Sequence, residues 1–129
     1  MEHEIKKKVL IVEDEERLRN LIKEQLEEAG YEVLGAMDGE VGLKVLTEEN
    51  PDLVILDLIL PKKDGFEFLE EMKSRLETKE IPVVVLTNLE EKFDIEKAMS
   101  YGVRAYLIKA NYKPRDVVEK VNKILAIAA

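Results

Sequence analysis

Several apolar stretches of this chain end in polar residues that could take part in chemistry. In chain order, these residues are Glu13 and Asp14, then Asp57, Thr87 and Lys109. Carboxylates brought within a few ångströms of one another repel, so that one of them takes up a proton or a cation binds. A hard divalent ion with oxygen ligands, Mg²⁺ in a cell, suits such a cluster. A cation, an ammonium and a hydroxyl together are the groups needed to receive a phosphoryl group on a carboxylate.

Each of these residues alone also has an ordinary structural explanation. Asp57 could form a turn, and Glu13 or Asp14 could cap a helix. Thr87 could hydrogen-bond the nearby backbone, and Lys109 could extend from a strand end towards water. These explanations become less convincing together, because all five residues are expected at one edge of one sheet.

Five short runs are expected to form strands. Tyr31–Met37 alternates between apolar and other residues, whereas continuous apolar runs bounded by turn residues, above all Leu53–Leu56, are typical of strands buried on both faces. The five runs are Lys8–Val12, Tyr31–Met37, Leu53–Leu56, Pro82–Leu86 and Ala105–Ile108. The chain is organised around the third of them, in the stretch Asn50–Gly65, which runs directly into Asp57.

Helical periodicity predicts a helix after each strand. The helices are expected over Glu15–Ala29, Gly39–Glu49, Phe66–Leu76, Glu90–Tyr101 and from Pro114 onward. The residues expected to face the core include Leu18, Leu21, Ile22, Leu26 and Ala29 of the first helix, Phe66, Leu69, Met72 and Leu76 of the third, and Val117, Val118, Val121, Ile124 and Leu125 of the last.

Strands that alternate with helices in this way require a parallel sheet covered on both faces, with right-handed crossovers. The predicted fold class is therefore α/β, a doubly wound five-stranded parallel sheet with five helices. In such sheets the ligand crevice lies at the carboxyl ends of the strands.

Length and composition predict a single domain of 129 residues, with a polar leader over residues 1–6 and the domain over residues 7–129. The net charge of −8 disfavours direct binding to nucleic acid. The absence of cysteine excludes disulfides and thiolate metal sites, and the single histidine, His3, is expected to have no role. No apolar run is long enough to span a membrane, and we expect a cytoplasmic protein.

Four stretches carry a resemblance to a known family. They read VLIVEDE, LVILDLILPKKDG, VVVLTN and AYLIKA, in this order and at the expected strand ends. The sequence resembles the receiver domain of two-component response regulators, of the chemotaxis-type single-domain kind, over about residues 7 to 125. The resemblance implies a flavodoxin-like fold with strand order 2-1-3-4-5.

The same resemblance implies a phosphoacceptor and a metal site. Asp57 would accept a phosphoryl group from the phosphohistidine of a histidine kinase or phosphotransfer protein. Asp14, Asp57 and the backbone carbonyl of Ile59 would hold Mg²⁺, with Glu13 assisting directly or through water. Such a protein is not an enzyme for an external substrate, since it catalyses only its own phosphorylation and dephosphorylation.

The resemblance further implies a switch. Lys109 and Thr87 would contact phosphoryl oxygens, Thr87 would move towards the phosphoryl group, and Tyr106 would turn inward. This movement would change the face made by the fourth helix, the last strand and the fifth helix, where a protein partner would dock. The protein would be a monomer or a phosphorylation-dependent dimer. Tyr106 could also simply be a half-buried aromatic residue of a strand.

Departures from the family pattern at four positions have expected consequences. Ala110 follows Lys109 where the family usually has a proline with a cis peptide bond, so this bond is strained or trans. Asn88 is larger than the usual residue and is expected to narrow access to the phosphoryl group. Ile59 and Leu89 cannot orient an attacking water, which predicts slow loss of phosphate.

Alternative functions differ in how well the residues suit them. A haloacid-dehalogenase-like phosphatase needs a second Asp two residues after the nucleophile, where this chain has Ile59. A flavodoxin-like FMN carrier needs a phosphate loop, and Glu13–Glu16 would repel phosphate there. A receiver-like interaction scaffold that is not phosphorylated stays open, as do the identity of the kinase and the presence of an effector domain outside this sequence.

Overall fold

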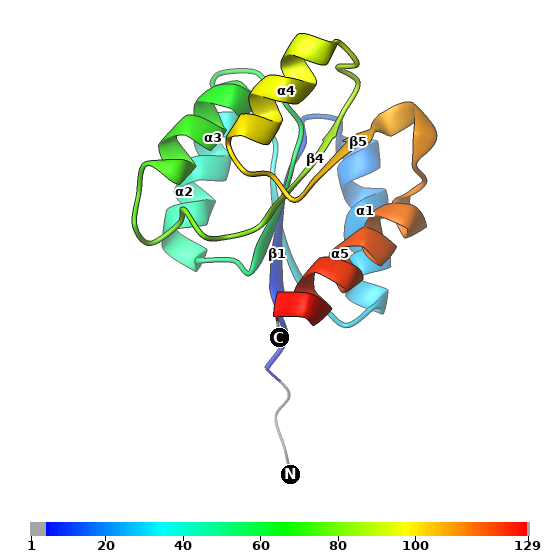
Figure 1. Cartoon of the computed structure of the whole chain (residues 1–129). Coiled ribbons are helices and arrows are strands. Elements are labelled where there is room, and N and C mark those ends of the chain that lie inside the picture. Colours follow the sequence, from blue (N-terminus) through cyan, green and yellow to red (C-terminus); the bar gives the residue numbers. More distant parts are fainter. Residues whose placement is uncertain (1–4, 129) are drawn as a thin grey trace.

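The computed structural model describes residues 5–128 and contains a central sheet with helices on both sides (Figure 1). His3 and most of the expected leader lie outside the described residues. The strands are β1 (Lys8–Val12), β2 (Glu32–Ala36), β3 (Leu53–Leu56), β4 (Val83–Thr87) and β5 (Ala105–Ile108). The helices are α1 (Glu16–Glu28), α2 (Gly39–Glu49), α3 (Gly65–Lys73), α4 (Lys92–Ser100) and α5 (Pro114–Ala128), with a 3₁₀ turn, η1, over Lys109–Asn111.

The sheet is parallel throughout, and its strand order is β2-β1-β3-β4-β5. This order confirms the predicted fold class. Strand order reverses beside β1, which pairs with both β2 and β3, and the register aligns Val12 with Leu56. The polar residues that follow β1 and β3 therefore emerge side by side.

Two apolar cores lie on opposite faces of the sheet, and alternate residues of each strand contribute to them. In β1, Leu10 and Val12 face the core under α2, α3 and α4, whereas Val9 and Ile11 face the core under α1 and α5. Figure 1 shows these two groups of helices on either side of the sheet. Burial on both faces explains why β1, β3 and β4 read as continuous apolar runs, whereas the edge strand β2 is exposed at Glu32 and Gly35.

Side-chain and backbone caps fix several of the helix starts. The Asp38 carboxylate accepts a hydrogen bond from the Val41 amide at 2.8 Å, at the start of α2. Asp64 and Glu67 form a capping box at the start of α3. Pro114 is the first residue of α5, as predicted, because proline lacks the amide hydrogen that a first helical turn leaves unpaired.

The prediction that Leu76 faces the core is wrong, because its side chain is 81% exposed. The helix that was expected to include it ends at Lys73, and a turn follows. The buried Thr78 hydroxyl donates a hydrogen bond to the Met72 carbonyl at 2.6 Å and so satisfies a backbone group at the helix end. Beyond this point the helical period no longer determines which side chains point inward.

Fewer residues of α1 face the core than predicted. Ile22 and Leu26 are buried, but Leu21 is 42% exposed and Ala29 is exposed. The apolar stripe of α5 is confirmed, since its five predicted core residues are all buried. Within residues 5–128, no helix is both long enough and apolar enough to cross a lipid bilayer.

Candidate functional site

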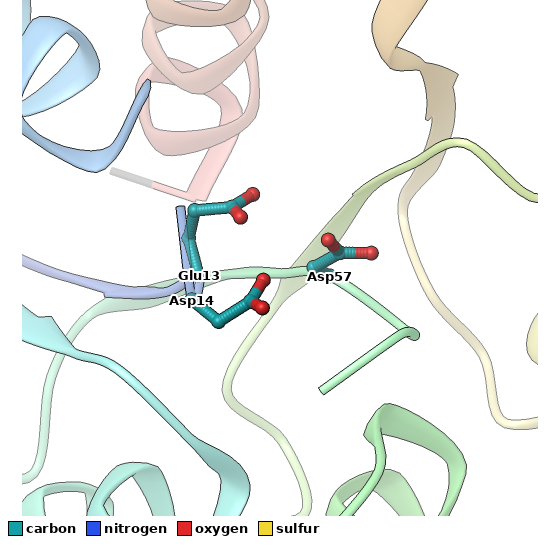
Figure 2. Close-up of side chains that lie close together, drawn as sticks. All are labelled: Glu13, Asp14 and Asp57. Atoms are coloured by element: carbon teal, nitrogen blue, oxygen red, sulfur yellow. The ribbon is translucent and has the colours of Figure 1, made fainter. Parts of the chain in front are cut away.

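The carboxyl ends of β1 and β3 bring three carboxylates together. Glu13, Asp14 and Asp57 each offer an oxygen atom, and these atoms all lie within 4.8 Å of one another. Figure 2 shows the Glu13 and Asp14 side chains beside that of Asp57. Glu13 and Asp57 are only 2% and 4% exposed, whereas Asp14 lies at the solvent edge. The predicted acidic cluster is therefore present.

Lys109 reaches into this cluster from the end of β5. Its Nζ lies 2.7 Å from Oε1 of Glu13 and 2.7 Å from Oδ2 of Asp57. Burial of the ammonium works to lower the pKa of Lys109, but hydrogen bonds to Asp57 and Glu13 outweigh it and the pKa is raised. Lys109 is therefore a permanent cation at neutral pH, and it bridges the two buried acids.

Burial and neighbouring groups shift the pKa of Glu13. Its Oε2 accepts a hydrogen bond from the Glu15 amide at 2.9 Å, so this side chain contacts the turn before α1. Burial raises the pKa of Glu13, and the nearby Asp57 charge adds to this effect. The hydrogen bonds from Lys109 and the Glu15 amide only partly offset it. The charged form of Glu13 is thus disfavoured, mainly because its side chain is buried.

The donor set of this cluster suits a hard divalent cation. All the candidate ligand atoms are carboxylate oxygens, and one of the acids is open to solvent for an approaching hydrated ion. Mg²⁺ prefers a few carboxylate oxygens and keeps several of its waters. The residues present therefore fit Mg²⁺, and Glu13, Asp14 and Asp57 are the side chains that would hold it.

Asp57 is tied to the loop that follows it, which joins β3 to α3. The Ile59 amide donates to Oδ1 of Asp57 at 3.1 Å, and the Gly65 amide donates to the Leu58 carbonyl at 3.0 Å. A Cβ on Gly65 would lie 2.6 Å from the Asp57 carbonyl oxygen, so this close return of the chain requires glycine. The loop is consequently held against the Asp57 carboxylate.

The same loop contains a three-residue turn. Lys62 has a φ of 70°, and the Lys63 amide donates to the Pro61 carbonyl at 2.8 Å. A non-glycine residue rarely adopts such a φ, and a turn of this kind carries backbone strain. The Lys63 ammonium pairs with Glu71 of α3 at 2.5 Å and anchors the turn on its outer side.

Thr87 is fully buried at the end of β4 and makes no hydrogen bond to the acids within the described residues. Its hydroxyl oxygen accepts a long hydrogen bond, 3.4 Å, from the Leu89 amide. The Tyr106 hydroxyl donates to the Leu89 carbonyl at 2.8 Å. One residue of the loop between β4 and α4 thus contacts both expected switch residues.

Tyr106 is half-buried beside this loop. Burial, together with the negative charges of Asp94 and Asp57, raises the pKa of Tyr106 to about 12. Its hydroxyl therefore stays protonated and remains a hydrogen-bond donor at neutral pH. The residue is both a partly buried strand aromatic and a donor to the Leu89 carbonyl.

The peptide bond after Lys109 is trans, since the described residues contain no cis peptide bond. The chain passes from β5 directly into η1, so that Lys109 begins a 3₁₀ turn. Of the two expected outcomes for the Lys109–Ala110 peptide, strained or trans, the structure has the trans bond. Lys109 nevertheless reaches both buried acids.

Sequence reasoning did not single out Arg19, Gly35 or Gly39. Arg19 donates from Nη1 to the Glu13 carbonyl at 2.7 Å, and Gly35 lies beneath its side chain. A Cβ on Gly39 would lie only 1.8 Å from the Lys63 carbonyl oxygen. Gly35 could have indicated the Arg19 contact, because a glycine inside a strand commonly marks a close approach by another group.

Comparison with known proteins identifies the family. The family model for the response regulator receiver domain matches residues 9–122. The chain is 40% identical over 119 residues to the alkaline phosphatase synthesis transcriptional regulatory protein PhoP of Bacillus subtilis, covering 92% of this chain and 48% of that protein. The chain thus spans about half the length of this curated relative.

Solved structures of response regulators are also similar to this chain. The phosphorylated cyanobacterial phytochrome response regulator RcpA superposes with a TM-score of 0.85 at 34% identity, covering 97% of each chain. The Mn²⁺-bound response regulator Rcp1 superposes with a TM-score of 0.78 at 35% identity, covering 92% of this chain and 91% of the other.

Proposed function

The chain belongs to the response regulator receiver family of two-component signalling, and from this premise we propose that it is a phosphorylation-dependent switch with Asp57 as its phosphoacceptor. The observation that carries the proposal is the buried Asp57 carboxylate, held at 2.7 Å by Lys109 and placed beside two further acids. We propose that the receiver domain occupies residues 7–129, after a short polar leader.

In the proposed reaction, a carboxylate oxygen of Asp57 attacks the phosphorus of a phosphohistidine on a histidine kinase or phosphotransfer protein. A new P–O bond forms, the P–N bond breaks, and its electron pair returns to the imidazole. Lys109 holds the carboxylate in place beforehand and then pairs with a phosphoryl oxygen, and Thr87 donates its hydroxyl to another. The charge of Lys109 and the position of Thr87 at the same sheet edge support these roles.

The proposal includes Mg²⁺ held by Asp14, Asp57 and the Ile59 backbone carbonyl, with Glu13 assisting directly or through water. When bound, the ion supplies positive charge against the phosphoryl oxygens. The three carboxylates support this part, because their oxygen atoms lie within 4.8 Å of one another and an added cation would offset their mutual repulsion. The Mn²⁺ form of the related Rcp1 is consistent with an ion here.

The proposed output is a change in the face made by α4, β5 and α5. Leu89 connects Thr87 with Tyr106, so movement of Thr87 towards a phosphoryl group would disturb the Tyr106 hydrogen bond. Helix α4 has a single buried residue, Ala98, and is therefore easily displaced. We propose a protein partner on this face, a cytoplasmic location, no direct contact with nucleic acid by this chain, and a monomer or a phosphorylation-dependent dimer.

Loss of phosphate is proposed to be slow. Ile59 is 51% exposed beside the acceptor, and Leu89 lies at the neighbouring loop, so neither side chain can orient a water for attack on phosphorus. Asn88 is exposed at the same rim. A phosphoryl half-life of seconds at neutral pH, measured by loss of the mass adduct, would contradict this part of the proposal.

The test is phosphorylation by a small donor. The protein is incubated with Mg²⁺ and acetyl phosphate, and the intact mass is recorded for the wild type and for Asp57→Ala. One phosphate adduct on the wild type only supports the proposal. An adduct that survives Asp57→Ala refutes the choice of acceptor. No adduct on either protein, together with no binding of Mg²⁺ and beryllofluoride, favours the receiver-like scaffold that signals without phosphorylation.

A further inference from the structure

We propose that Arg19 is a positioning residue for the metal site and that it acts on Asp14 through the backbone of the turn between β1 and α1. The inference rests on the Mg²⁺ site of the proposed function. Arg19 projects from the first turns of α1, and its Nη1 donates to the Glu13 carbonyl at 2.7 Å. Within residues 5–128, Arg19 makes no ion pair or hydrogen bond with the carboxylates of the metal site.

This contact fixes the peptide group that joins Glu13 to Asp14. The Glu13 amide donates to the Ala36 carbonyl of β2 at 3.0 Å, and the Glu13 carbonyl accepts from Arg19. The amide and the carbonyl of Glu13 are therefore each held by a partner of their own. Since the Glu13 carbonyl belongs to the same planar peptide as the Asp14 amide, its orientation determines where the Asp14 side chain leaves the backbone.

Asp14 depends on this backbone support more than the other two acids do. Glu13 and Asp57 are held by Lys109 at 2.7 Å, and each carboxylate also accepts a backbone amide. For Asp14, no hydrogen bond or ion pair to the carboxylate is found within residues 5–128, and the residue is exposed. A ligand without side-chain partners loses its geometry when its peptide can rotate.

Gly35 of β2 makes room for the Arg19 side chain. A Cβ at this position would lie 3.3 Å from Cδ and 3.6 Å from Nε of Arg19. Gly35 lies on the same sheet face as Val33, which packs in the core under α1 and α5. Glycine inside a strand weakens the strand, and here its lack of a side chain lets Arg19 cross the sheet edge to the Glu13 carbonyl.

The charge of Arg19 and its hydrogen bond predict opposite changes in Mg²⁺ affinity when Arg19 is replaced. As a cation near three acids, Arg19 repels Mg²⁺, so removing its charge alone would tighten Mg²⁺ binding. As a positioning residue it keeps Asp14 in place, so removing its hydrogen bond would weaken binding. The direction of the change in Mg²⁺ affinity therefore separates the two roles.

The experiment compares three variants of the full chain by isothermal titration with Mg²⁺. Arg19→Met removes the donor, and Gly35→Val blocks its path while keeping the charge. Arg17→Met is the matched control, because it removes the same charge from an exposed position on α1. We expect Arg19→Met to weaken Mg²⁺ binding about tenfold, the lower end of effects seen for groups that orient metal ligands. Gly35→Val should weaken binding in the same direction, and Arg17→Met should leave it unchanged or slightly tighter.

An Mg²⁺ affinity for Arg19→Met that equals or exceeds that of the wild type would overturn the inference. A second measurement on metal-free protein tests the positioning directly, since NMR relaxation of the Asp14 amide should report added motion in Arg19→Met and none in Arg17→Met. An unchanged Asp14 amide also overturns the inference. Failure of the wild type to bind Mg²⁺ would instead refute the metal site of the proposed function, while the Asp14 amide still decides whether Arg19 orders this turn.

Discussion

Replacing Lys109 by methionine should destabilise the protein far more than replacing an exposed lysine. The Lys109 ammonium makes two hydrogen bonds of 2.7 Å to carboxylates whose side chains are only 3% and 4% exposed. Lys109→Met leaves Glu13 and Asp57 facing each other without a cation. Both are too buried for water to replace the ammonium fully.

The expected loss in the free energy of unfolding is about 3 kcal/mol in metal-free buffer. Removing one partner of a buried ion pair typically costs about 3–5 kcal/mol, because the remaining charge is left uncompensated. The lower end of this range applies because Lys109 itself is 14% exposed and Asp14 opens the cluster to solvent. Lys113→Met is the control at an exposed position, and it should change stability by no more than about 0.5 kcal/mol.

The assay is urea denaturation followed by far-ultraviolet circular dichroism, with and without Mg²⁺. A bound ligand stabilises the folded state by about 2.7 kcal/mol at a hundred times its dissociation constant. Because Lys109→Met removes a competing cation, Mg²⁺ should bind this variant more tightly and restore more stability to it than to the wild type. A second substitution, Asp57→Asn, should also recover much of the loss, since it removes one of the two unpaired charges.

Three results would refute this reasoning. A loss below about 1 kcal/mol for Lys109→Met would mean that the pair is screened like one at the surface. A loss that Asp57→Asn does not reduce would mean that packing of the lysine stem, rather than its charge, is responsible. Equal stabilisation of both proteins by Mg²⁺ would show that Lys109 and the cation do not share the site.

Two further predictions concern residues beside the site. Tyr106 has its pKa raised to about 12, so between pH 10 and 12 the folded protein keeps a proton that the unfolded chain releases, and the free energy of unfolding falls as pH rises. Tyr106→Phe should remove this part of the pH dependence in urea titrations; an identical slope in both proteins would contradict it. Gly39→Ala should destabilise the fold and weaken Mg²⁺ binding, because its Cβ would lie 1.8 Å from the Lys63 carbonyl oxygen in the loop that carries Ile59. Gly35→Ala is its control for stability, since that Cβ meets only flexible atoms of Arg19 at 3.3 Å, and equal stability of the two variants would refute the prediction.

The fold could be predicted from local patterns because each pattern reflects burial of one short segment. Continuous apolar runs such as Leu53–Leu56 mark strands that are covered on both faces, and the stripe of α5 marks its buried side. Parallel strands place their carboxyl ends at one edge, so the positions of Glu13, Asp57 and Lys109 at one site followed from the alternation of strands and helices. The family resemblance added the strand order.

Helix ends were predicted less well, because tertiary contacts decide them. Leu76 continues the helical period of α3, yet the chain leaves the helix after Lys73 and the Thr78 hydroxyl binds the Met72 carbonyl. A hydroxyl that lies beyond the helix thus competes with continued helix formation. Periodicity alone contains no information about that competition.

The sequence by itself determined which polar residues lie at the carboxyl edge of the sheet, whereas only the tertiary structure decided which contacts hold them there. Lys109 bridges two acids because the carboxyl ends of β5, β3 and β1 lie at the same edge of the sheet. Asp57 is 52 residues away from Lys109 in the chain. The contact of Arg19 with Gly35 depends on how α1 docks on the sheet. The close approach of Gly39 to Lys63 depends on how α2 docks. Such contacts join segments distant in sequence at distances of a few ångströms, and the spacing of residue types along a chain does not specify those distances.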